Sequence, residues 1–285
     1  MVTTNEAGFA IRRMALGEVG LIREWANAEG WNPGTHDSEA FFSADPDGFF
    51  LGELAGTPVG CVSCVRYGTD FGFLGQYIVR PEHRGRGYGI ALGKAGLAHL
   101  VGRCVGLDGV LSKVAAYARA GFKFAHHTTR FASVGGGLRP DGLVTLSEVP
   151  FETVAEFDAR CFPAPREAFL RAWLALPESV GFAAVEDGQL AGYGVLRKSA
   201  NGHKVGPLFA NDPVVAVRLL TGLVAAIPGG LFSIDIPDGT VQPDGRWLVG
   251  AFGLTEVFQT ARMYTSTPPS HDSKRVFGVT SLELG

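Results

Sequence analysis

The chain has 285 residues, of which 46% are hydrophobic and 19% charged, and its formal net charge is −3 at pH 7. This length accommodates one large domain or two of ordinary size. The slightly acidic balance argues against nucleic-acid binding, and no apolar run reaches the roughly 18 residues of a membrane-spanning helix. The first residues lack the basic and apolar regions of a secretory signal. We therefore expect a cytoplasmic globular protein without nucleic-acid or membrane partners.

The first 67 residues predict a strand, two helices and two further strands. Apolar residues recur at helical spacing after the first strand, and an Asn-Pro-Gly turn separates the two helices. The predicted elements are a strand at 9–16, helices at 17–28 and from about Asp37, and strands at 48–54 and 59–67.

Cys61 and Cys64 form a Cys-x-x-Cys pair, a spacing found in redox and zinc sites. They lie within a predicted strand, where residues three apart point to opposite faces. No second pair follows at zinc spacing. We interpret these cysteines as buried structural thiols and predict no metal site.

A glycine loop follows the next predicted strand, at 71–79. The sequence continues with a Pro turn, the run Arg84-Gly-Arg-Gly-Tyr-Gly89 and a helix at 90–100. Three alternate glycines leave no Cβ over the loop, and the start of the helix offers free N–H groups with a partial positive charge. Arg84 and Arg86 add full charges. We predict an anion site here, most simply for a pyrophosphate, with a plain tight turn as the alternative.

The surrounding residues narrow the choice of anion. A Walker loop requires Lys-Ser or Lys-Thr after its last glycine, where this chain has Ile90-Ala91. A dinucleotide fingerprint requires Gly-x-Gly-x-x-Gly directly after a strand. The pattern Arg-x-x-Gly-x-Gly after a strand and a Pro-Glu-His turn resembles the pyrophosphate loop of the GNAT superfamily of acetyl-CoA-dependent N-acetyltransferases.

The resemblance covers about residues 9–133. Beyond the glycine loop, the sequence predicts a strand at 102–110, a helix at 112–120 ended by Gly121, and a strand from Phe122 to about Phe131. This order of elements is similar to that of GNAT domains. The run Val134-Gly-Gly-Gly137 to Asp141-Gly142 then predicts a linker.

The remainder of the chain is a weak repeat of the first part. Matching residues are 131 to 133 positions apart: Gly48 and Gly181, Gly75 and Gly206, Gly121 and Gly253, Arg130 and Arg262. We predict two tandem GNAT-like domains, at 1–133 and 143–285, joined by a linker at 134–142. Each is expected to be an α/β (α+β) fold with a mixed, mostly antiparallel twisted sheet flanked by helices.

The second copy lacks the glycine loop. Asn211-Asp212-Pro213 stands in its place, and a carboxylate capping a helix would repel a phosphate. We therefore expect this copy to be degenerate and without a cofactor site. The alternating run at 276–285 predicts a final strand near the domain junction.

The resemblance implies where acetyl-CoA would bind. In GNAT enzymes two parallel strands splay apart, and the pantetheine arm bonds to the backbone of one of them. The expected contacts are Tyr77, Ile78 and Val79 for the pantetheine arm, and Arg84, Gly85, Arg86, Gly87, Tyr88 and Gly89 for the pyrophosphate.

The resemblance also implies a general acid. Tyr117 stands four residues before Gly121-Phe122, and in many members of the family a Tyr at this spacing is the general acid. The second copy has Val249 at the matching position. A simple packing role for Tyr117 is the alternative. The chain departs from the family at two places, with Val110 where many members have Asn and Phe73 near where many have a Glu base.

The general base therefore stays unassigned. Glu29, His36, Asp37 and Asp70 are candidates by residue type, and a water relay is also open. The loop at 29–34 is the expected wall of the acceptor site, with Trp31 and Asn32 as substrate-binding residues. Trp31 either stacks on a substrate or plugs the loop.

These inferences predict an N-acetyltransferase. It would move the acetyl group from acetyl-CoA to a primary amine of a small-molecule or peptide acceptor, by direct attack in a ternary complex. The alternative is a non-catalytic acyl-CoA-binding or sensing module. We expect the protein to be a monomer or a homodimer.

Overall fold

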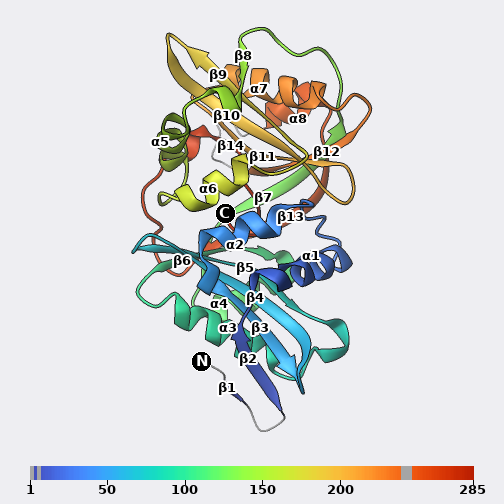
Figure 1. Ribbon diagram of the computed structural model, residues 1–285, viewed down its shortest axis with the longest axis vertical. Helices are drawn as coiled ribbons and strands as arrows, with labels where there is room; N and C mark the ends of the chain where they lie inside the picture. Colours follow the sequence, from blue (N-terminus) through green and yellow to red (C-terminus); the bar gives the residue numbers. More distant parts are fainter. Residues whose placement is uncertain (1–2, 5–7, 239–245) are drawn as a thin grey trace.

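The computed structural model describes residues 3–4, 8–238 and 246–285 (Figure 1). The N-terminal half lies at one end of an elongated molecule and the C-terminal half at the other, and the C-terminus lies between them. None of the described helices combines the length and the apolar character needed to cross a membrane.

The N-terminal half runs from β1 to β7. Its elements are β1 (Thr3–Thr4), β2 (Phe9–Arg13), α1 (Val19–Ala28), α2 (Asp37–Ala44), β3 (Phe49–Leu54), β4 (Thr57–Tyr67), β5 (Phe71–Val79), α3 (Tyr88–His99), β6 (Cys104–Val110), α4 (Val114–Arg119) and β7 (Lys123–Val134). All the elements expected from the sequence in this half are present, with bounds shifted by a few residues.

The C-terminal half repeats this order. Its elements are β8 (Leu143–Thr145), α5 (Phe151–Cys161), α6 (Glu167–Leu174), β9 (Ser179–Glu186), β10 (Gln189–Lys198), β11 (His203–Ala210), α7 (Pro213–Ala225), β12 (Leu231–Pro237), α8 (Arg246–Phe252), β13 (Thr255–Tyr264) and β14 (Val276–Gly278). Parallel pairing in the described sheet is confined to β5–β6 and β11–β12, so the predicted mixed, mostly antiparallel fold is confirmed.

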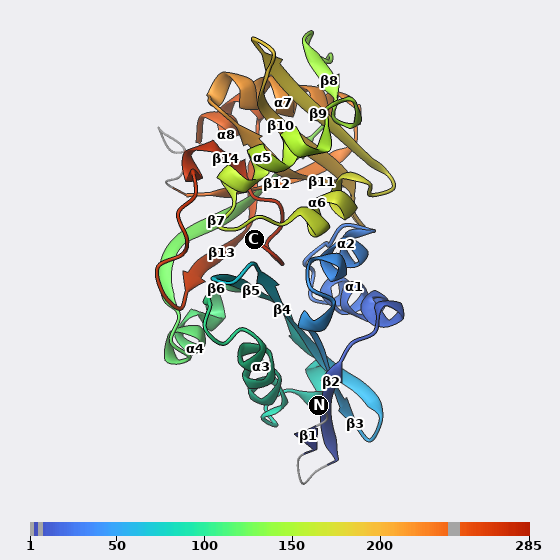
Figure 2. The same ribbon diagram turned by 60° about the vertical axis from the view of Figure 1, so that its left-hand side comes forward.

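Strand alternation divides the side chains of β4 between two cores. Cys61 faces the α1 and α2 side and packs in the cluster that contains Phe41, whereas Cys64 faces α3 and packs in the cluster that contains Leu92. Figure 2 shows α3 on one face of the sheet and α1 with α2 on the other. Both thiols are free and buried, and burial raises the pKa of each. The prediction of structural thiols on opposite faces is confirmed.

The two halves share a hydrophobic core at their junction. Helix α2 of the N-terminal half packs on α6 of the C-terminal half. The ring of Phe41 stacks on Trp173 with centroids 5.7 Å apart, and both side chains are fully buried. Burying a large aromatic side chain contributes about 1.5–3 kcal/mol, so this contact stabilises the association of the halves.

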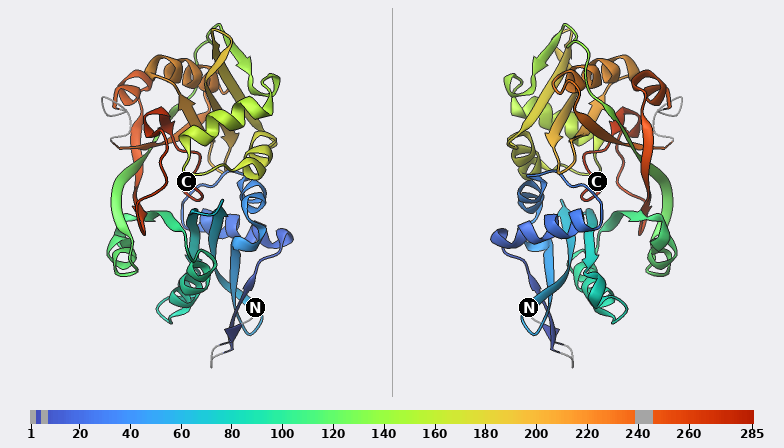
Figure 3. Two further views of the ribbon diagram at one scale, coloured as in Figure 1. Left: turned by 90° about the vertical axis from the view of Figure 1, so that its left-hand side faces the viewer. Right: turned by 90° about the vertical axis from the view of Figure 1, so that its right-hand side faces the viewer.

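The halves also exchange strands (Figure 3). Strand β7 pairs with β12 of the C-terminal half, from Thr128–Pro237 to Val134–Leu231, and β13 pairs with β6 of the N-terminal half. The two exchanged strands pair with each other as well, so one sheet runs through both halves. The boundary expected at 134–142 therefore divides the chain but not the sheet. Residues 135–142 connect β7 to β8 without helix or strand.

A local pseudo-two-fold axis passes between the exchanged strands. Thr128 and Thr260 lie directly opposite each other in the β7–β13 pair. They are 132 positions apart, which is also the offset between Arg130 and Arg262 in the repeat. Two antiparallel strands place equivalent residues face to face only where an axis of this kind runs between them. The repeat in sequence is thus a repeat in space.

Two buried ion pairs obey the same symmetry. Arg262 on β13 bonds both oxygens of Asp108 on β6, at 2.9 and 2.6 Å, and Arg130 on β7 bonds both oxygens of Asp235 on β12, at 2.7 and 2.9 Å. Each pair joins a strand to its neighbour from the other half. Removing one partner of such a pair costs about 3–5 kcal/mol, because the other charge stays buried without compensation. These pairs fix the register of the exchange.

The C-terminal tail, residues 279–285, differs from the sequence-based expectation. The strand predicted for 276–285 is present only as β14, and the prediction is wrong for the residues that follow. The chain turns there because the Ser281 hydroxyl and carbonyl accept hydrogen bonds from the amides of Leu284 and Gly285, each at 3.1 Å. The buried Tyr67 hydroxyl donates to the carbonyl of Leu284 at 3.2 Å. The tail is thereby held between the two halves.

Candidate active site

A cavity opens where β5 and β6 separate. The two strands pair only from Phe71–Cys104 to Phe73–Gly106. Beyond this point the pairing of β5 with β4 shifts by one residue, and Gln76 has φ of 46°, which marks a bulge that bends β5 away from β6. The resulting cavity has a volume of about 760 Å³, within the range of small-molecule and cofactor sites.

The glycine loop closes one end of this cavity. Gly85 and Gly87 have φ of 76° and 83°, and a Cβ at either position would meet no atom within 4 Å, so the loop is open above its backbone. Gly87 is the N-cap of α3 and supplies no side chain to its first turn. The first N–H groups of α3 are therefore available to an anion, and the helix dipole favours negative charge there.

The two arginines of the loop have different environments. Arg84 lines the cavity, donates to the carbonyl of Val79 at 2.7 Å and forms an ion pair with Glu29. It therefore connects the glycine loop to the end of β5 and to the loop after α1. Arg86 is exposed and lies outside the cavity lining.

Tyr77 fills the space between β5 and α3. Its hydroxyl donates to the carbonyl of Gly89, and Cβ atoms at Gly89 and Gly93 would lie 3.2 and 3.1 Å from that hydroxyl. Burial raises the pKa of Tyr77 to about 12. The side chain of Tyr77 thus positions α3, while Ile78 and Val79 continue along the cavity beside it.

Tyr117 on α4 lines the same cavity. Its ring is half-buried, meets Phe122 edge-on with centroids 6.2 Å apart, and lies so close to β6 that a Cβ at Gly109 would be 2.7 Å from it. Burial raises the pKa of the Tyr117 phenol. The structure therefore brings Tyr117 to the same cavity as the glycine loop, with its phenol in the protonated form at neutral pH.

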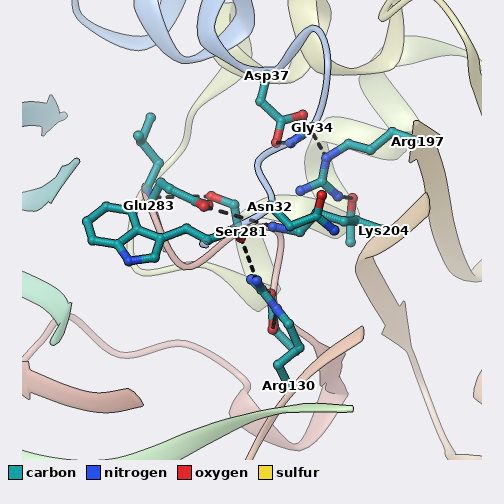
Figure 4. A network of polar contacts seen from close by, with 12 residues as sticks. Asn32, Gly34, Asp37, Arg130, Arg197, Lys204, Ser281 and Glu283 are labelled. Atoms are coloured by element: carbon teal, nitrogen blue, oxygen red, sulfur yellow. Dashed lines mark hydrogen bonds and ion pairs between the residues drawn. The ribbon is translucent and has the colours of Figure 1, made fainter. Parts of the chain in front are cut away.

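The loop after α1 forms a further wall of the cavity. Trp31 lines the cavity, and its carbonyl accepts a hydrogen bond from Arg130 Nη1 at 2.7 Å. Asn32 lies outside the lining, because its side chain exchanges two hydrogen bonds with the backbone of Asn201. Figure 4 shows Asn32 in the polar network between the halves. Of the two expected acceptor-site residues, the structure places Trp31 at the cavity and Asn32 at the junction.

The residues considered as general bases are dispersed. Glu29 lines the cavity but is paired with Arg84. His36 is beside Glu178, at 3.2 Å, and Asp37 is buried against Arg197, at 2.8 Å. Asp70 is exposed and, like His36 and Asp37, lies outside the cavity lining. Phe73, near where the family's base was expected, is fully buried.

Several lining residues come from the C-terminal half and were not expected from the sequence. The C-terminal half contributes Phe258, Thr260, Leu282 and Glu283. The N-terminal half contributes three further lining residues that were not expected, namely Gln76, Asp108 and Arg130. One signal was available: Gly75 lies in mid-strand, and a glycine there often marks a close backbone approach. A Cβ at Gly75 would lie 1.8 Å from the carbonyl oxygen of Glu283.

The equivalent gap in the C-terminal half is closed. Strands β11 and β12 pair only from His203–Phe232 to Val205–Ile234, as their counterparts do. Strand β14 then pairs with β11 at Leu208 and Phe209, and the amide of Val279 donates to the carbonyl of Asp235 on β12. The chain itself therefore fills the space that stays open in the N-terminal half.

The helix after this second gap is also closed to anions. Asp212 caps α7 by accepting from the amides of Val214 and Val215, at 2.8 and 3.0 Å. A carboxylate that occupies the free N–H groups also repels a phosphate. Its counterpart at α3 is the bare N-cap Gly87.

Comparisons of the sequence support two related domains. The family model described as "Acetyltransferase (GNAT) family" matches residues 19–122, and the model described as "Acetyltransferase (GNAT) domain" matches residues 154–278. A holothin acyltransferase from Pseudoalteromonas sp. is 32% identical over 276 residues, which cover 95% of this chain and 92% of that protein.

Solved structures share the fold over nearly the whole chain. A putative acetyltransferase from Pyrococcus horikoshii superposes with a TM-score of 0.84 at 21% identity, covering 99% of this chain and 98% of that one. A tandem GNAT protein from the clavulanic acid biosynthesis pathway superposes with a TM-score of 0.63 at 19% identity, covering 92% and 99%. The arrangement of two halves is therefore found in other proteins.

Proposed function

Since the chain belongs to the GNAT superfamily of acyltransferases and carries one such domain in each half, we propose that its N-terminal half transfers the acetyl group of acetyl-CoA to a primary amine. One observation supports this proposal above the others. A single cavity is lined by the glycine loop, by the open edge of β5, and by Tyr117 and Trp31. It thus has places for a pyrophosphate, an extended arm, a proton donor and an acceptor.

The cofactor would use the parts of the cavity that the sequence singled out. The pyrophosphate would lie on the loop 84–89 and the free amides of α3. The pantetheine arm would follow β5 at Tyr77, Ile78 and Val79, where β6 has diverged and no longer pairs with that edge. This placement directs the thioester toward the point where the two strands separate.

Tyr117 would act as the general acid. The amine attacks the thioester carbonyl, the C–N bond forms, and the C–S bond breaks with release of the CoA sulfur. A thiolate leaves more readily when it receives a proton, and the phenol of Tyr117 can supply one, since a tyrosine is protonated at neutral pH and burial raises its pKa further. The residue would thus protonate the leaving group.

The acceptor would enter beside two aromatic residues of the lining, Trp31 of the N-terminal half and Phe258 of the C-terminal half. The name of the relative from Pseudoalteromonas assigns it the acylation of holothin. For this chain we propose a small-molecule amine with an apolar body, because aromatic side chains bury such groups well. A peptide amine is the other acceptor to include in a screen.

The cofactor site is tested by Gly87→Asp, which gives α3 the carboxylate cap that α7 has in Asp212. Acetyl-CoA at 100 times its Kd should stabilise the wild-type protein by about 2.7 kcal/mol, measured as a rise in Tm, and the variant should lose this rise. Gly102→Asp is the matched control, because Gly102 follows the other end of α3, has φ of 84° against 83° for Gly87, and is equally open.

Turnover is tested with a panel of amines and detection of the released thiol. The wild-type protein should release CoA in the presence of an accepted amine, and Gly87→Asp should not. A Tm unchanged by every acyl-CoA would contradict the proposal. Binding of acetyl-CoA without turnover of any amine would instead favour an acyl-CoA-sensing module.

A further inference from the structure

The C-terminal tail places a carboxylate, that of Glu283, at the cavity of the N-terminal half. Glu283 is 5% exposed, lines the cavity, and belongs to the tail that follows β14. Its backbone passes over β5 at Gly75, two residues beyond the last β5–β6 pair, where a Cβ would be 1.8 Å from the Glu283 carbonyl. Glu283 therefore lies where β5 and β6 separate.

The position of Glu283 is fixed by the fold. Tyr67 on β4 holds the Leu284 carbonyl, and Ser281 holds the amides of Leu284 and Gly285. Gly75 admits the tail, since any larger residue would collide with it. These contacts fix the backbone on both sides of Glu283, which limits where its carboxylate can lie before the reaction.

Glu283 has an unused acceptor oxygen. Its nearest cation is Lys204 on β11, at 3.9 Å, and neither Glu283 Oε2 nor Lys204 Nζ has a hydrogen-bond partner among the described residues. The neighbouring buried pairs are tighter: Arg130 with Asp235 and Arg197 with Asp37 are joined at 2.7 and 2.8 Å. Figure 4 shows Glu283 in one network of polar contacts with Lys204, Arg130, Arg197 and Asp37.

The other carboxylates of the described lining, Asp108 and Glu29, already form ion pairs. Both oxygens of Asp108 accept from Arg262, and Glu29 is paired with Arg84. Glu283 is thus the carboxylate of the described lining that has a buried oxygen without a hydrogen-bond partner. Charged groups that act on it are Lys204 on β11, Arg130 on β7 and Asp108 on β6.

On the basis of the proposed function, we propose that Glu283 is the proton acceptor for the incoming amine. Its carboxylate takes one proton from the bound ammonium ion, and the lone pair released on nitrogen forms the C–N bond. The C–S bond breaks and the sulfur takes the Tyr117 proton. The nitrogen loses its second excess proton to the Tyr117 phenolate, and Glu283 returns its proton to solvent. One proton is released per turnover, so atoms and charges balance.

The role of Glu283 is tested by the pH profile of kcat in Glu283→Gln. A positioned general base contributes about 100- to 10,000-fold to the rate, so the variant should lose at least about 100-fold in kcat near pH 7. The loss should shrink as the pH rises, because solvent then deprotonates the amine. The acetyl-CoA-dependent rise in Tm should remain. Glu186→Gln, which alters a surface pair with Arg218, is the control for the substitution.

Two further variants separate this role from a purely structural one. Glu283→Gln leaves the buried Lys204 without a countercharge, so Glu283→Gln with Lys204→Met restores the charge balance and carries the test if the single variant does not fold. Lys204→Met alone also breaks this buried pair but keeps the carboxylate, so it should retain more turnover than Glu283→Gln. If Glu283 serves only to pair with Lys204, both single variants should lose activity equally, at every pH.

The outcomes distinguish the two proposals. Wild-type turnover combined with an unchanged pH profile in the Glu283 variants would contradict the role of Glu283 and leave the N-acetyltransferase proposal standing. Absence of wild-type turnover on every amine would contradict the proposed function and this inference with it.

Discussion

Tyr117 on α4 and Val249 on α8 occupy equivalent places in the two halves. The amide of Phe122 donates to the Tyr117 carbonyl at 3.1 Å, and the amide of Leu254 donates to the Val249 carbonyl at 2.9 Å. The helix end is thus built in the same way with and without a phenol. This comparison indicates that the hydroxyl of Tyr117 is not required for the fold.

We predict that Tyr117→Phe lowers kcat by about 100-fold near pH 7, because the thiolate then leaves without a positioned proton donor. The ring and its contact with Phe122 are kept, so the acetyl-CoA-dependent rise in Tm should not change. Because burial raises the pKa of this phenol, its deprotonation limits wild-type activity only on the alkaline side. Steady-state kinetics across pH measure both effects, and a variant as active as the wild type would exclude Tyr117 as the acid.

At the scale of single elements, the starts of α3 and α7 differ in whether their amides are free to bind an anion. Gly87 leaves the amides of α3 free, whereas Asp212 occupies those of α7. The second gap is closed twice, since β14 also lies between β11 and β12. Removing the helix cap alone therefore does not restore an anion site that a cofactor could reach.

We predict a stoichiometry of one acetyl-CoA per chain, for the wild-type protein and for Asp212→Gly alike. The exchange of an Asp cap for Gly costs only a few tenths of a kcal/mol, so the variant should fold, and β14 should still fill the gap. Titration calorimetry gives the stoichiometry directly. Two equivalents bound by either protein would show that β14 does not block the second site.

Local sequence was sufficient to predict most elements and the glycine loop. Alternation, turn residues and the glycines are properties of short segments, and they predicted β5, α3 and the loop between them. The place of Tyr117 was implied by the resemblance to the GNAT family. The tail was predicted wrongly as a continuous strand, because alternation does not reveal that Ser281 turns the chain. Glu283 was missed for the same reason.

At the scale of the whole molecule, the exchange of β7 and β13 could not be read from the sequence. Both strands carry the same pattern and the same Arg, at 130 and 262, so each fits the edge of either half. In the exchanged arrangement Arg262 pairs with Asp108 and Arg130 with Asp235, and these partners are distant in sequence. Hence the two domains were predicted as separate units although their sheet is continuous.

We predict that both halves unfold in a single cooperative transition. Separation would break the β6–β13 and β7–β12 ladders and leave the charges of both Arg–Asp pairs buried without partners. The calorimetric enthalpy should therefore equal the van't Hoff enthalpy for the entire chain. Two resolved transitions, or a calorimetric enthalpy near twice the van't Hoff value, would show that the halves unfold independently.

The closed gap of the C-terminal half acquires a further meaning from this exchange. A duplicated unit that has lost its ligand would ordinarily be free to decay or to be deleted. Here it cannot be deleted, because it supplies β13 to the edge of β6, the tail that passes over Gly75, and a wall of the cavity at the glycine loop. The half whose gap is closed is therefore a structural part of the half whose gap is open.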